Sequence, residues 1–134
     1  MQGIRKLSRM TVYKNLWMQV HEDAVRFPDG SEGIYGLVDK PDFALIIPRH
    51  DDGRFQLVQQ YRYPVRGRYW EFPQGSWEGE QNADLEHVAL SELEEETGFK
   101  AKSLTKLGHL FEAYGFANQG FDVYLAEELT PGEV

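Results

Sequence analysis

Short hydrophobic runs separated by turn sequences dominate the first seventy positions, a pattern typical of strands, and the run at 55–61 alternates loosely between apolar and polar residues. The expected strands cover residues 16–27, 31–38, 43–48 and 55–61. Pro28-Asp29-Gly30 separates the first two, and Asp51-Asp52-Gly53 lies between the second two. In the first segment proline presets φ, and in both a glycine supplies a positive φ, so both are turn sequences. The pattern therefore predicts two hairpins.

A single helix is expected in the second half of the chain. A short strand at 69–73 leads to Gly75, and Asn82 or Asp84 can cap a helix that runs to Thr97. Gly98 follows as the residue that ends the helix. Two more strands are expected at 104–112 and 121–125. The order of strands, helix and strands favours an α+β domain, layered α/β/α, with a mixed sheet.

The acidic residues of this helix are not equivalent. At 100° per residue, the apolar stripe that should face the core comprises Leu85, Val88, Ala89 and Leu93. Glu92 and Glu96 fall inside that stripe, Glu95 lies at its edge, and Glu94 points to the opposite side. A run of glutamates is usually a solvated helix face, but here only Glu94 fits that reading well.

Two carboxylates four residues apart at the edge of a core are costly unless they are protonated, paired or bound to a metal ion. Their position near the helix C-terminus adds an unfavourable dipole interaction. A divalent cation relieves all of these costs, and Mg²⁺ or Mn²⁺ prefers oxygen ligands and often shares them with phosphate. The helix therefore favours phosphoryl chemistry.

The composition of the chain limits the possible number of domains, the kinds of metal site and the classes of partner. With 134 residues and 41% hydrophobic content, the chain is long enough for one domain and short for two. The absence of cysteine excludes disulfides, thiolate metal sites and a cysteine nucleophile. A net charge of −8 disfavours broad nucleic-acid binding. No apolar stretch approaches the length of a membrane span and no leader pattern is present, so we expect a soluble, cytoplasmic protein.

The region around the helix resembles the Nudix box, Gly-x5-Glu-x7-Arg-Glu-U-x-Glu-Glu-x-Gly-U, in which U is a bulky apolar residue. Residues 91–99, Ser-Glu-Leu-Glu-Glu-Glu-Thr-Gly-Phe, match its second half at every fixed position except Ser91, where arginine is usual. Gly75 matches the first glycine, but the interval to the helix is about two residues longer than in the pattern. Glu80 is consequently out of register, and Ala83 occupies the position of the first glutamate.

Flanking segments extend the resemblance to the ADP-ribose pyrophosphatase-like group. They are Gln-Gln-Tyr-Arg-Tyr-Pro at 59–64, Trp-Glu-Phe-Pro-Gln-Gly at 70–75 and Phe-Asp-Val-Tyr-Leu-Ala at 121–126. The resemblance implies a Nudix fold over one domain, 1–134. Residues 1–40 would form N-terminal strands, including a hairpin, and 41–134 a Nudix core that lacks the usual C-terminal helix.

The resemblance also implies roles for individual residues. Glu92, Glu95 and Glu96 would be catalytic and would bind Mg²⁺ or Mn²⁺, with the Gln74 carbonyl completing the metal shell. Arg62 and Glu71 would face the substrate, although a surface arginine and a strand-edge ion pair are the alternatives for these two. The histidines show no ligand spacing. A general base is not assigned, since Glu112, Glu127 and Glu128 match no family position.

The implied reaction is metal-dependent hydrolysis of a pyrophosphate bond in a nucleoside diphosphate linked to another group, with ADP-ribose or a nucleotide sugar as the favoured substrate. Tyr114 stands where tyrosine resembles diadenosine polyphosphate hydrolases, so that class is the alternative. A weakly catalytic nucleotide-binding or regulatory module is a second alternative, favoured by Ser91 and the shortened C-terminus. Exposed strand edges would favour a homodimer through the N-terminal strands.

Overall fold

The computed structural model describes residues 3–76 and 84–132. The chain forms two compact units. The first comprises Met1–Pro41 and Phe111–Gly120, and the second comprises Asp42–Leu110 and Phe121–Val134. The expectation of one domain over the whole chain stays a prediction.

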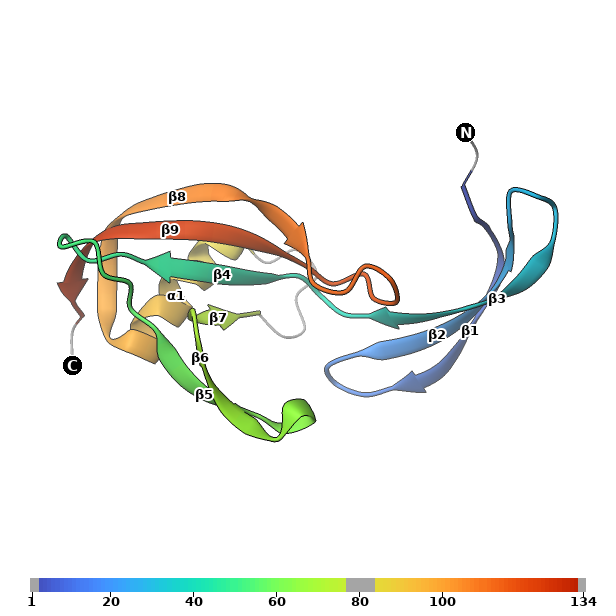
Figure 1. Cartoon of the computed structure of the whole chain (residues 1–134), viewed down its shortest axis with the longest axis horizontal. Helices are drawn as coiled ribbons and strands as arrows, with labels where there is room; N and C mark the ends of the chain where they lie inside the picture. The colour runs from blue at the N-terminus through green and yellow to red at the C-terminus, as the bar shows by residue number, and fades with distance from the viewer. Residues whose placement is uncertain (1–2, 77–83, 133–134) are drawn as a thin grey trace. The chain divides into compact units, whose positions relative to one another are not determined.

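The first unit is built on a three-stranded antiparallel sheet in the order β1-β2-β3 (Figure 1). Its strands are β1 (Arg5–Lys14), β2 (Gln19–Arg26) and β3 (Glu32–Asp39). The expected hairpin is confirmed, because β2 and β3 pair without a register shift and Gly30 in the turn has φ of 89°. We did not predict β1 as a separate strand. All ten of its residues are exposed, so it lacks the buried face that alternation reports.

The second unit contains a mixed four-stranded sheet in the order β7-β4-β9-β8. These strands are β7 (Gln74–Gly75), β4 (Phe43–Pro48), β9 (Gly120–Pro131) and β8 (Phe99–Phe111). The central strand β4 is parallel to β9 and antiparallel to β7. The expected mixed sheet is therefore confirmed, although β8 and β9 are longer than the 104–112 and 121–125 segments predicted.

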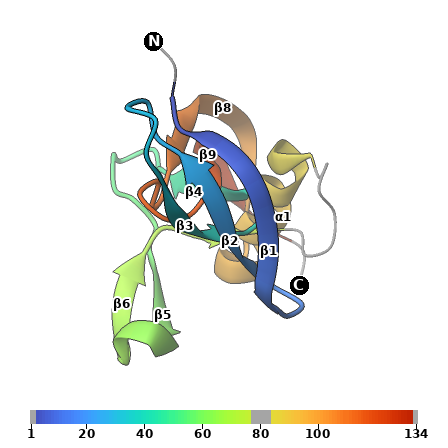
Figure 2. The same ribbon diagram turned by 90° about the vertical axis from the view of Figure 1, so that its right-hand side faces the viewer.

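The second predicted hairpin is wrong in its pairing. The turn forms, since the Gly53 N–H donates to the His50 carbonyl at 2.9 Å and Arg49 bridges Phe55. The strands then separate, because β7 and β9 already occupy both edges of β4. Instead β5 (Val58–Arg62) pairs with β6 (Gly67–Glu71) as a two-stranded hairpin around the 3-10 turn Tyr63–Val65. Figure 2 shows this hairpin extending away from the four-stranded sheet.

The predicted helix is α1 (Leu85–Thr97), and its two ends follow the expected capping chemistry. The Asp84 carboxylate accepts the Glu86 N–H at 3.1 Å. Gly98 has φ of 77°, and its N–H donates to the Glu94 carbonyl at 2.9 Å. Asn82, the alternative cap, lies outside the described residues.

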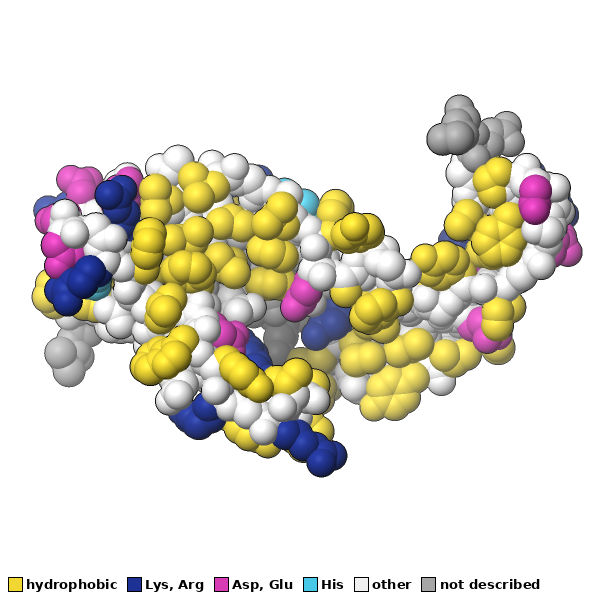
Figure 3. Space-filling view, in the orientation of Figure 1, with side chains coloured by type: hydrophobic (Ala, Val, Ile, Leu, Met, Phe, Trp, Pro, Cys, Tyr) yellow, Lys and Arg dark blue, Asp and Glu magenta, His cyan; other side chains and the backbone are white. Residues whose placement is uncertain are grey.

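The core of the second unit lies between α1 and one face of the sheet. Its fully or almost fully buried members are Ala44, Ile46, Val88, Ala89, Leu93, Tyr124 and Ala126. The opposite face presents many hydrophobic side chains over β4, β8 and β9 (Figure 3). Within residues 3–76 and 84–132, α1 is the one α-helix, and it has neither the length nor the apolarity to cross a membrane. The cytoplasmic location stays a prediction.

Candidate active site

The α1 glutamates follow the predicted sorting only in part. Glu92 and Glu96 are partly buried, as expected, but Glu94 is also partly buried and Glu95 is the exposed one. The Glu94 carboxylate is 4.0 Å from the Lys100 ammonium. Packing of Val88, Ala89 and Leu93 onto the sheet thus brings two carboxylates with it, because they share the same side of the helix.

Gly75 lies directly against the Glu92 side chain. A Cβ atom at position 75 would come within less than 3.0 Å of three Glu92 side-chain atoms, a separation that real Cβ atoms almost never show. A side chain at position 75 would therefore displace the Glu92 carboxylate from its present position, and glycine here allows the close approach of β7 rather than a positive φ.

Glu96 is the most perturbed carboxylate in the described part of the chain. Burial and the neighbouring Glu92 raise its pKa to about 7, although the Gln74 backbone N–H donates to it. Its Oε2 atom is buried and has no hydrogen-bond partner among the described residues. Burial, followed by repulsion from Glu95, also raises the pKa of Glu92. Two carboxylates that resist ionisation therefore lie together, and one of them has an unused oxygen.

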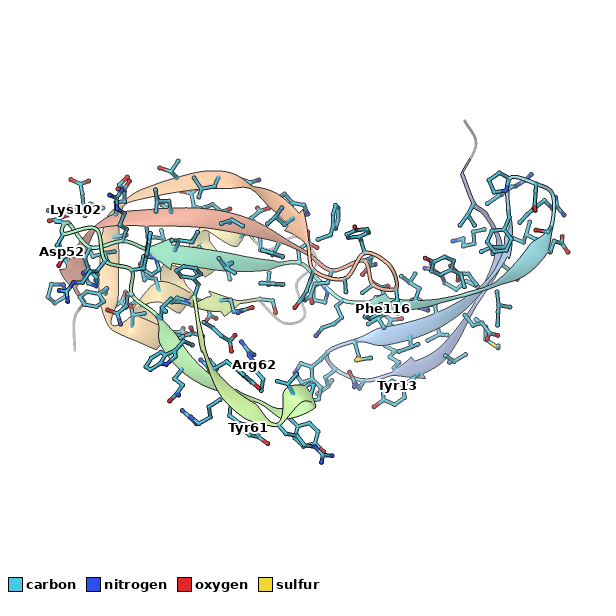
Figure 4. All side chains as sticks on the ribbon, in the orientation of Figure 1. Tyr13, Asp52, Tyr61, Arg62, Lys102 and Phe116 are labelled. Atoms are coloured by element: carbon cyan, nitrogen blue, oxygen red, sulfur yellow. The ribbon has the colours of Figure 1, made fainter. Side chains whose placement is uncertain are left out.

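Arg62 and Glu71 form a forked ion pair across the β5–β6 hairpin. The Arg62 Nη2 atom is 2.7 Å from Glu71 Oε1, and its Nε atom is 2.9 Å from Oε2. Glu71 also accepts the Gln74 side-chain N–H at 3.0 Å. In Figure 4, Arg62 lies on the inner side of the hairpin and Tyr61 on its outer side. The positive charge of Arg62 acts on Glu96, so the hairpin is electrostatically part of this site.

The family resemblance predicts Arg62 and Glu71 as substrate residues but does not predict that they pair with each other. The available signal was the Pro64 and Gly67 turn between two aromatic-rich segments, which predicts a hairpin. In its register, Arg62 lies opposite Gly67 and Val58 opposite Glu71. Residues 62 and 71 consequently share one face of the hairpin.

The site fits a hard cation, although it is not a closed coordination shell. Among residues 3–76 and 84–132, no three carboxylate or imidazole groups already surround a common point. The buried oxygen of Glu96 and the two raised pKa values are what a divalent cation would relieve. The metal roles of Glu92, Glu95, Glu96 and the Gln74 carbonyl stay predictions. Glu80 and Ala83 lie outside the described residues.

Tyr114 and the remaining acids are on other segments of the chain. Tyr114 belongs to the first unit, in the Phe111–Gly120 segment, and is 83% exposed. Its role as a substrate residue stays a prediction. Glu112 is an exposed member of the same segment. Glu127 and Glu128 line an open pocket with Arg49, His50, Asp51 and Ser103, which includes none of the proposed metal ligands.

Comparison with known families divides the chain close to residue 40. Residues 4–38 match the model described as the nucleoside diphosphate sugar hydrolase N-terminal domain, and residues 39–133 match the NUDIX domain. The chain belongs to the Nudix family. The family predicted from residues 59–99 and 121–126 is thereby confirmed.

Curated relatives of this Nudix chain carry two kinds of name. An ADP-ribose pyrophosphatase of Bacillus subtilis is 31% identical over 94% of this chain and 67% of its own length. A protein of the same name from Mycobacterium tuberculosis is 32% identical over 92% of this chain and 59% of its own length. A methanol dehydrogenase activator of Bacillus methanolicus is 28% identical over 91% and 65%, respectively. The Nudix chain thus spans about two thirds of these relatives or less.

A solved structure confirms the Nudix fold. The crystal structure of an ADP compounds hydrolase superimposes with a TM-score of 0.85 at 24% identity, covering 99% of this chain and 71% of that protein. The match includes the N-terminal strands, the mixed sheet and α1.

The raised carboxylate pKa values of this Nudix site predict an unusual pH dependence of the free energy of unfolding. In metal-free buffer, we expect the free energy of unfolding to fall as pH rises from about 4.5 to about 7, because folded Glu96 keeps its proton to a higher pH than the unfolded chain does. Glu92 acts in the same direction. Above pH 7, Glu96→Gln should be about 1–2 kcal/mol more stable than wild type, after solvent screening is allowed for.

Urea unfolding at pH 5 and pH 8 measures this difference. Glu112→Gln removes the same charge from an exposed position, so it should follow the wild-type pH dependence. If Glu96→Gln keeps the full wild-type dependence, Glu96 is not the titrating group.

Proposed function

We propose that this Nudix domain catalyses the hydrolysis of a pyrophosphate bond in a nucleoside diphosphate linked to a second group. One observation carries the proposal: Glu92 and Glu96 are partly buried, mutually repelling carboxylates on the helix that follows Gly75, and Arg62 acts electrostatically on Glu96. A dianionic pyrophosphate with its divalent cations supplies the charges that this arrangement lacks.

Glu92, Glu96 and the exposed Glu95 would hold Mg²⁺ or Mn²⁺, with the Gln74 carbonyl as a further oxygen ligand. When bound, the metal neutralises phosphate oxygens and activates water. Two contacts within the chain hold the proposed ligands in position. Gly75 leaves room for the Glu92 side chain, and the Gln74 N–H orients Glu96. Both contacts keep the carboxylates in place before a cation arrives.

Arg62 is proposed to bind a phosphate or ribose oxygen of the substrate. Its guanidinium is held in one orientation by the fork with Glu71, and a preoriented guanidinium suits phosphate oxygens. Glu71 is itself only 16% exposed, and Gln74 fixes its other contact. Glu71 therefore orients the Arg62 guanidinium. We propose that the inner side of the hairpin, to which Glu71 also belongs, faces the substrate.

ADP-ribose or a nucleotide sugar is the proposed substrate class. Two relatives are named ADP-ribose pyrophosphatases, and the model matched by residues 4–38 is described as belonging to nucleoside diphosphate sugar hydrolases. Tyr114 favours a diadenosine polyphosphate as the alternative substrate. A nucleotide-binding regulatory module is the second candidate function, and the relative named as a methanol dehydrogenase activator favours it.

A substrate panel tests the proposed hydrolysis. With Mg²⁺ or Mn²⁺, we expect turnover of ADP-ribose or nucleotide sugars above that of diadenosine polyphosphates. Glu96→Gln should lower kcat by more than the roughly 10- to 100-fold typical of groups that only orient a metal ligand. Coupled phosphate release measures the rates. Absence of turnover on every substrate would contradict the hydrolase proposal. Full activity of Glu96→Gln would contradict the assignment of Glu96 as a metal ligand.

We expect that neither alanine nor lysine can take over the proposed substrate-binding role of Arg62. Both variants lose the fork that matches two oxygens at once, so we expect kcat/KM to fall by about 10- to 100-fold. Arg68→Ala is the matched control, because Arg68 lies on the opposite face of the same hairpin and contacts Gln59 at 3.4 Å. Steady-state kinetics compare the three variants. Equal losses in Arg62→Ala and Arg68→Ala would indicate a general effect on the hairpin.

We also propose that the protein is a homodimer through its N-terminal strands. The strand β1 forms one edge of its sheet, and every residue in it is exposed. Large apolar side chains on and next to this strand are 41–86% exposed; they are Leu7, Met10, Val12, Tyr13, Leu16 and Trp17. An unpaired edge with an apolar surface favours association with another chain.

Size-exclusion chromatography with light scattering tests the homodimer. We expect a mass near twice the 15.5 kDa of the chain, and a shift toward the monomer in Met10→Glu. Lys102→Glu, on the exposed surface of β8, changes charge outside the first unit and should leave the mass unchanged. A wild-type protein that remains strictly monomeric would contradict this proposal.

A further inference from the structure

The β5–β6 hairpin carries an exposed tyrosine on the same face as Arg62. Directly opposed residues of an antiparallel pair share a face, and the face alternates at each step along a strand. Gln60 lies opposite Tyr69, so Tyr69 belongs to the inner face together with Arg62. Tyr61 and Trp70 belong to the outer face. Figure 4 shows Arg62 and Tyr61 on these opposite sides, and Tyr69 thus brings an aromatic ring to the Arg62 side.

The Tyr69 ring lies over the backbone of Gly67. A Cβ atom at position 67 would come within 2.9 Å of both Cε2 and the hydroxyl oxygen of Tyr69. A side chain there would therefore displace the ring from its present position. Gly67 is directly opposite Arg62, so the ring extends toward Arg62 and the tip of the hairpin. Tyr69 is nevertheless 53% exposed, and a ligand can reach it.

A series of contacts leads from the carboxylates of α1 to this ring. The Gln74 backbone N–H donates to Glu96, and the Gln74 side-chain N–H donates to Glu71 at 3.0 Å. Glu71 in turn accepts the Arg62 guanidinium at 2.7 Å. Glu71 is at the base of the hairpin, whereas the Tyr69 ring extends toward its tip. Along the hairpin, the guanidinium therefore lies between the carboxylates and the ring.

A nucleoside diphosphate carries its chemical groups in the same order. Its phosphates suit the carboxylates with their cation, and its phosphate or ribose oxygens suit the guanidinium. The planar base then extends beyond the guanidinium, where an aromatic ring can stack on it because every base has a π-face. The saturated ring of a ribose or another sugar has no π-face. Tyrosine also loses little conformational freedom on binding, since only two side-chain torsions are fixed.

We propose, on the basis of the hydrolase function proposed above, that Tyr69 stacks on the nucleobase of the substrate and that Gly67 positions its ring. Gly67 acts through Tyr69 and touches no reacting atom. Stacking does not read the hydrogen-bonding groups of a base, so Tyr69 strengthens binding without selecting strongly among bases. Its loss should raise the dissociation constant and KM and leave kcat nearly unchanged.

Two ligands that differ in the nucleoside test this role. α,β-Methylene-ADP and methylenediphosphonate share a phosphorus–carbon–phosphorus bridge that resists hydrolysis, and only the first has a base. With Mg²⁺, isothermal titration calorimetry of Tyr69→Leu should give a dissociation constant for α,β-methylene-ADP about 5- to 20-fold above wild type. The value for methylenediphosphonate should stay within about twofold, because that ligand has no base to stack. Tyr69→Phe keeps the ring and should bind both ligands as wild type does.

Tyr61→Leu is the matched control, because Tyr61 is also 53% exposed but belongs to the outer face. It should leave both dissociation constants unchanged. Equal losses in the two leucine variants, or an equal loss of both ligands in Tyr69→Leu, would indicate a general change in the hairpin and overturn the stacking role. An unchanged affinity of folded Tyr69→Leu for α,β-methylene-ADP would also overturn it. If thermal denaturation shows that Tyr69→Leu does not fold, Tyr69→Thr, which favours a strand, takes its place.

Gly67→Ala tests how the ring is placed. The added methyl group displaces the Tyr69 ring, so the dissociation constant of α,β-methylene-ADP should rise about 3- to 10-fold in the wild-type background. In the Tyr69→Leu background the same change should have less than about a twofold effect, because the ring is already absent. Equal effects in the two backgrounds would contradict the positioning role of Gly67.

Binding of α,β-methylene-ADP requires no turnover, which separates the stacking role from the hydrolase proposal. If no substrate is hydrolysed but this binding depends on Tyr69 as described, only hydrolysis is contradicted. If ADP-ribose is hydrolysed and its KM is the same in Tyr69→Leu as in wild type, only the stacking role is contradicted. Failure of wild type to bind α,β-methylene-ADP would overturn the stacking role directly.

Discussion

The burial of one side of α1 against β4 and β7 is the constraint on which the second unit depends. Leu93 and Ala89 are fully buried there, and Glu92 and Glu96 are carried to the same side because they are one turn apart on the helix. The fold gains a core from the apolar residues and accepts an electrostatic penalty from the acidic ones. A cationic group can offset that penalty. The packing of this helix and the cation binding proposed for it therefore depend on the same residues.

The neighbouring elements control how large that penalty becomes. Gly75 lets β7 approach Glu92 without a side chain between them, and Gln74 supplies one hydrogen bond to Glu96. The β5–β6 hairpin adds the positive charge of Arg62, but Glu71 takes up both of the guanidinium nitrogens that face it. The site is thus incompletely neutralised by its own residues. Such partial compensation allows tight cation binding without leaving the free protein unstable.

Local sequence signals determined the helix and the first hairpin well. Asp84 and Gly98 specify the ends of α1 through chemistry that acts within one turn, and Gly30 specifies a tight turn in the same way. The inward position of Glu92 and Glu96 also follows from helical geometry alone. These predictions depend on residues close together in the sequence, where periodicity is informative.

Pairing between distant strands could not be predicted from the same signals. The 43–48 strand pairs with residues 121–126 and not with its neighbour at 55–61, and the more distant strand contributes Tyr124 and Ala126 to the core. The Arg62–Glu71 fork likewise depends on a hairpin register that periodicity does not give. Strand β1 was missed because its residues have no buried face. The site residues were identified largely by family resemblance, and their contacts came from the fold.

The parallel pairing of β4 with β9 also affects the order in which the protein can assemble. During synthesis, α1 emerges before residues 121–126, so its apolar side and its two inward carboxylates exist before the strand that completes their sheet. The ladder between strands almost eighty positions apart requires closure of a long loop, which is entropically expensive and slow. Until it closes, the β4 edge and the apolar side of α1 are open to other chains, and the nascent protein is most vulnerable to aggregation in that interval.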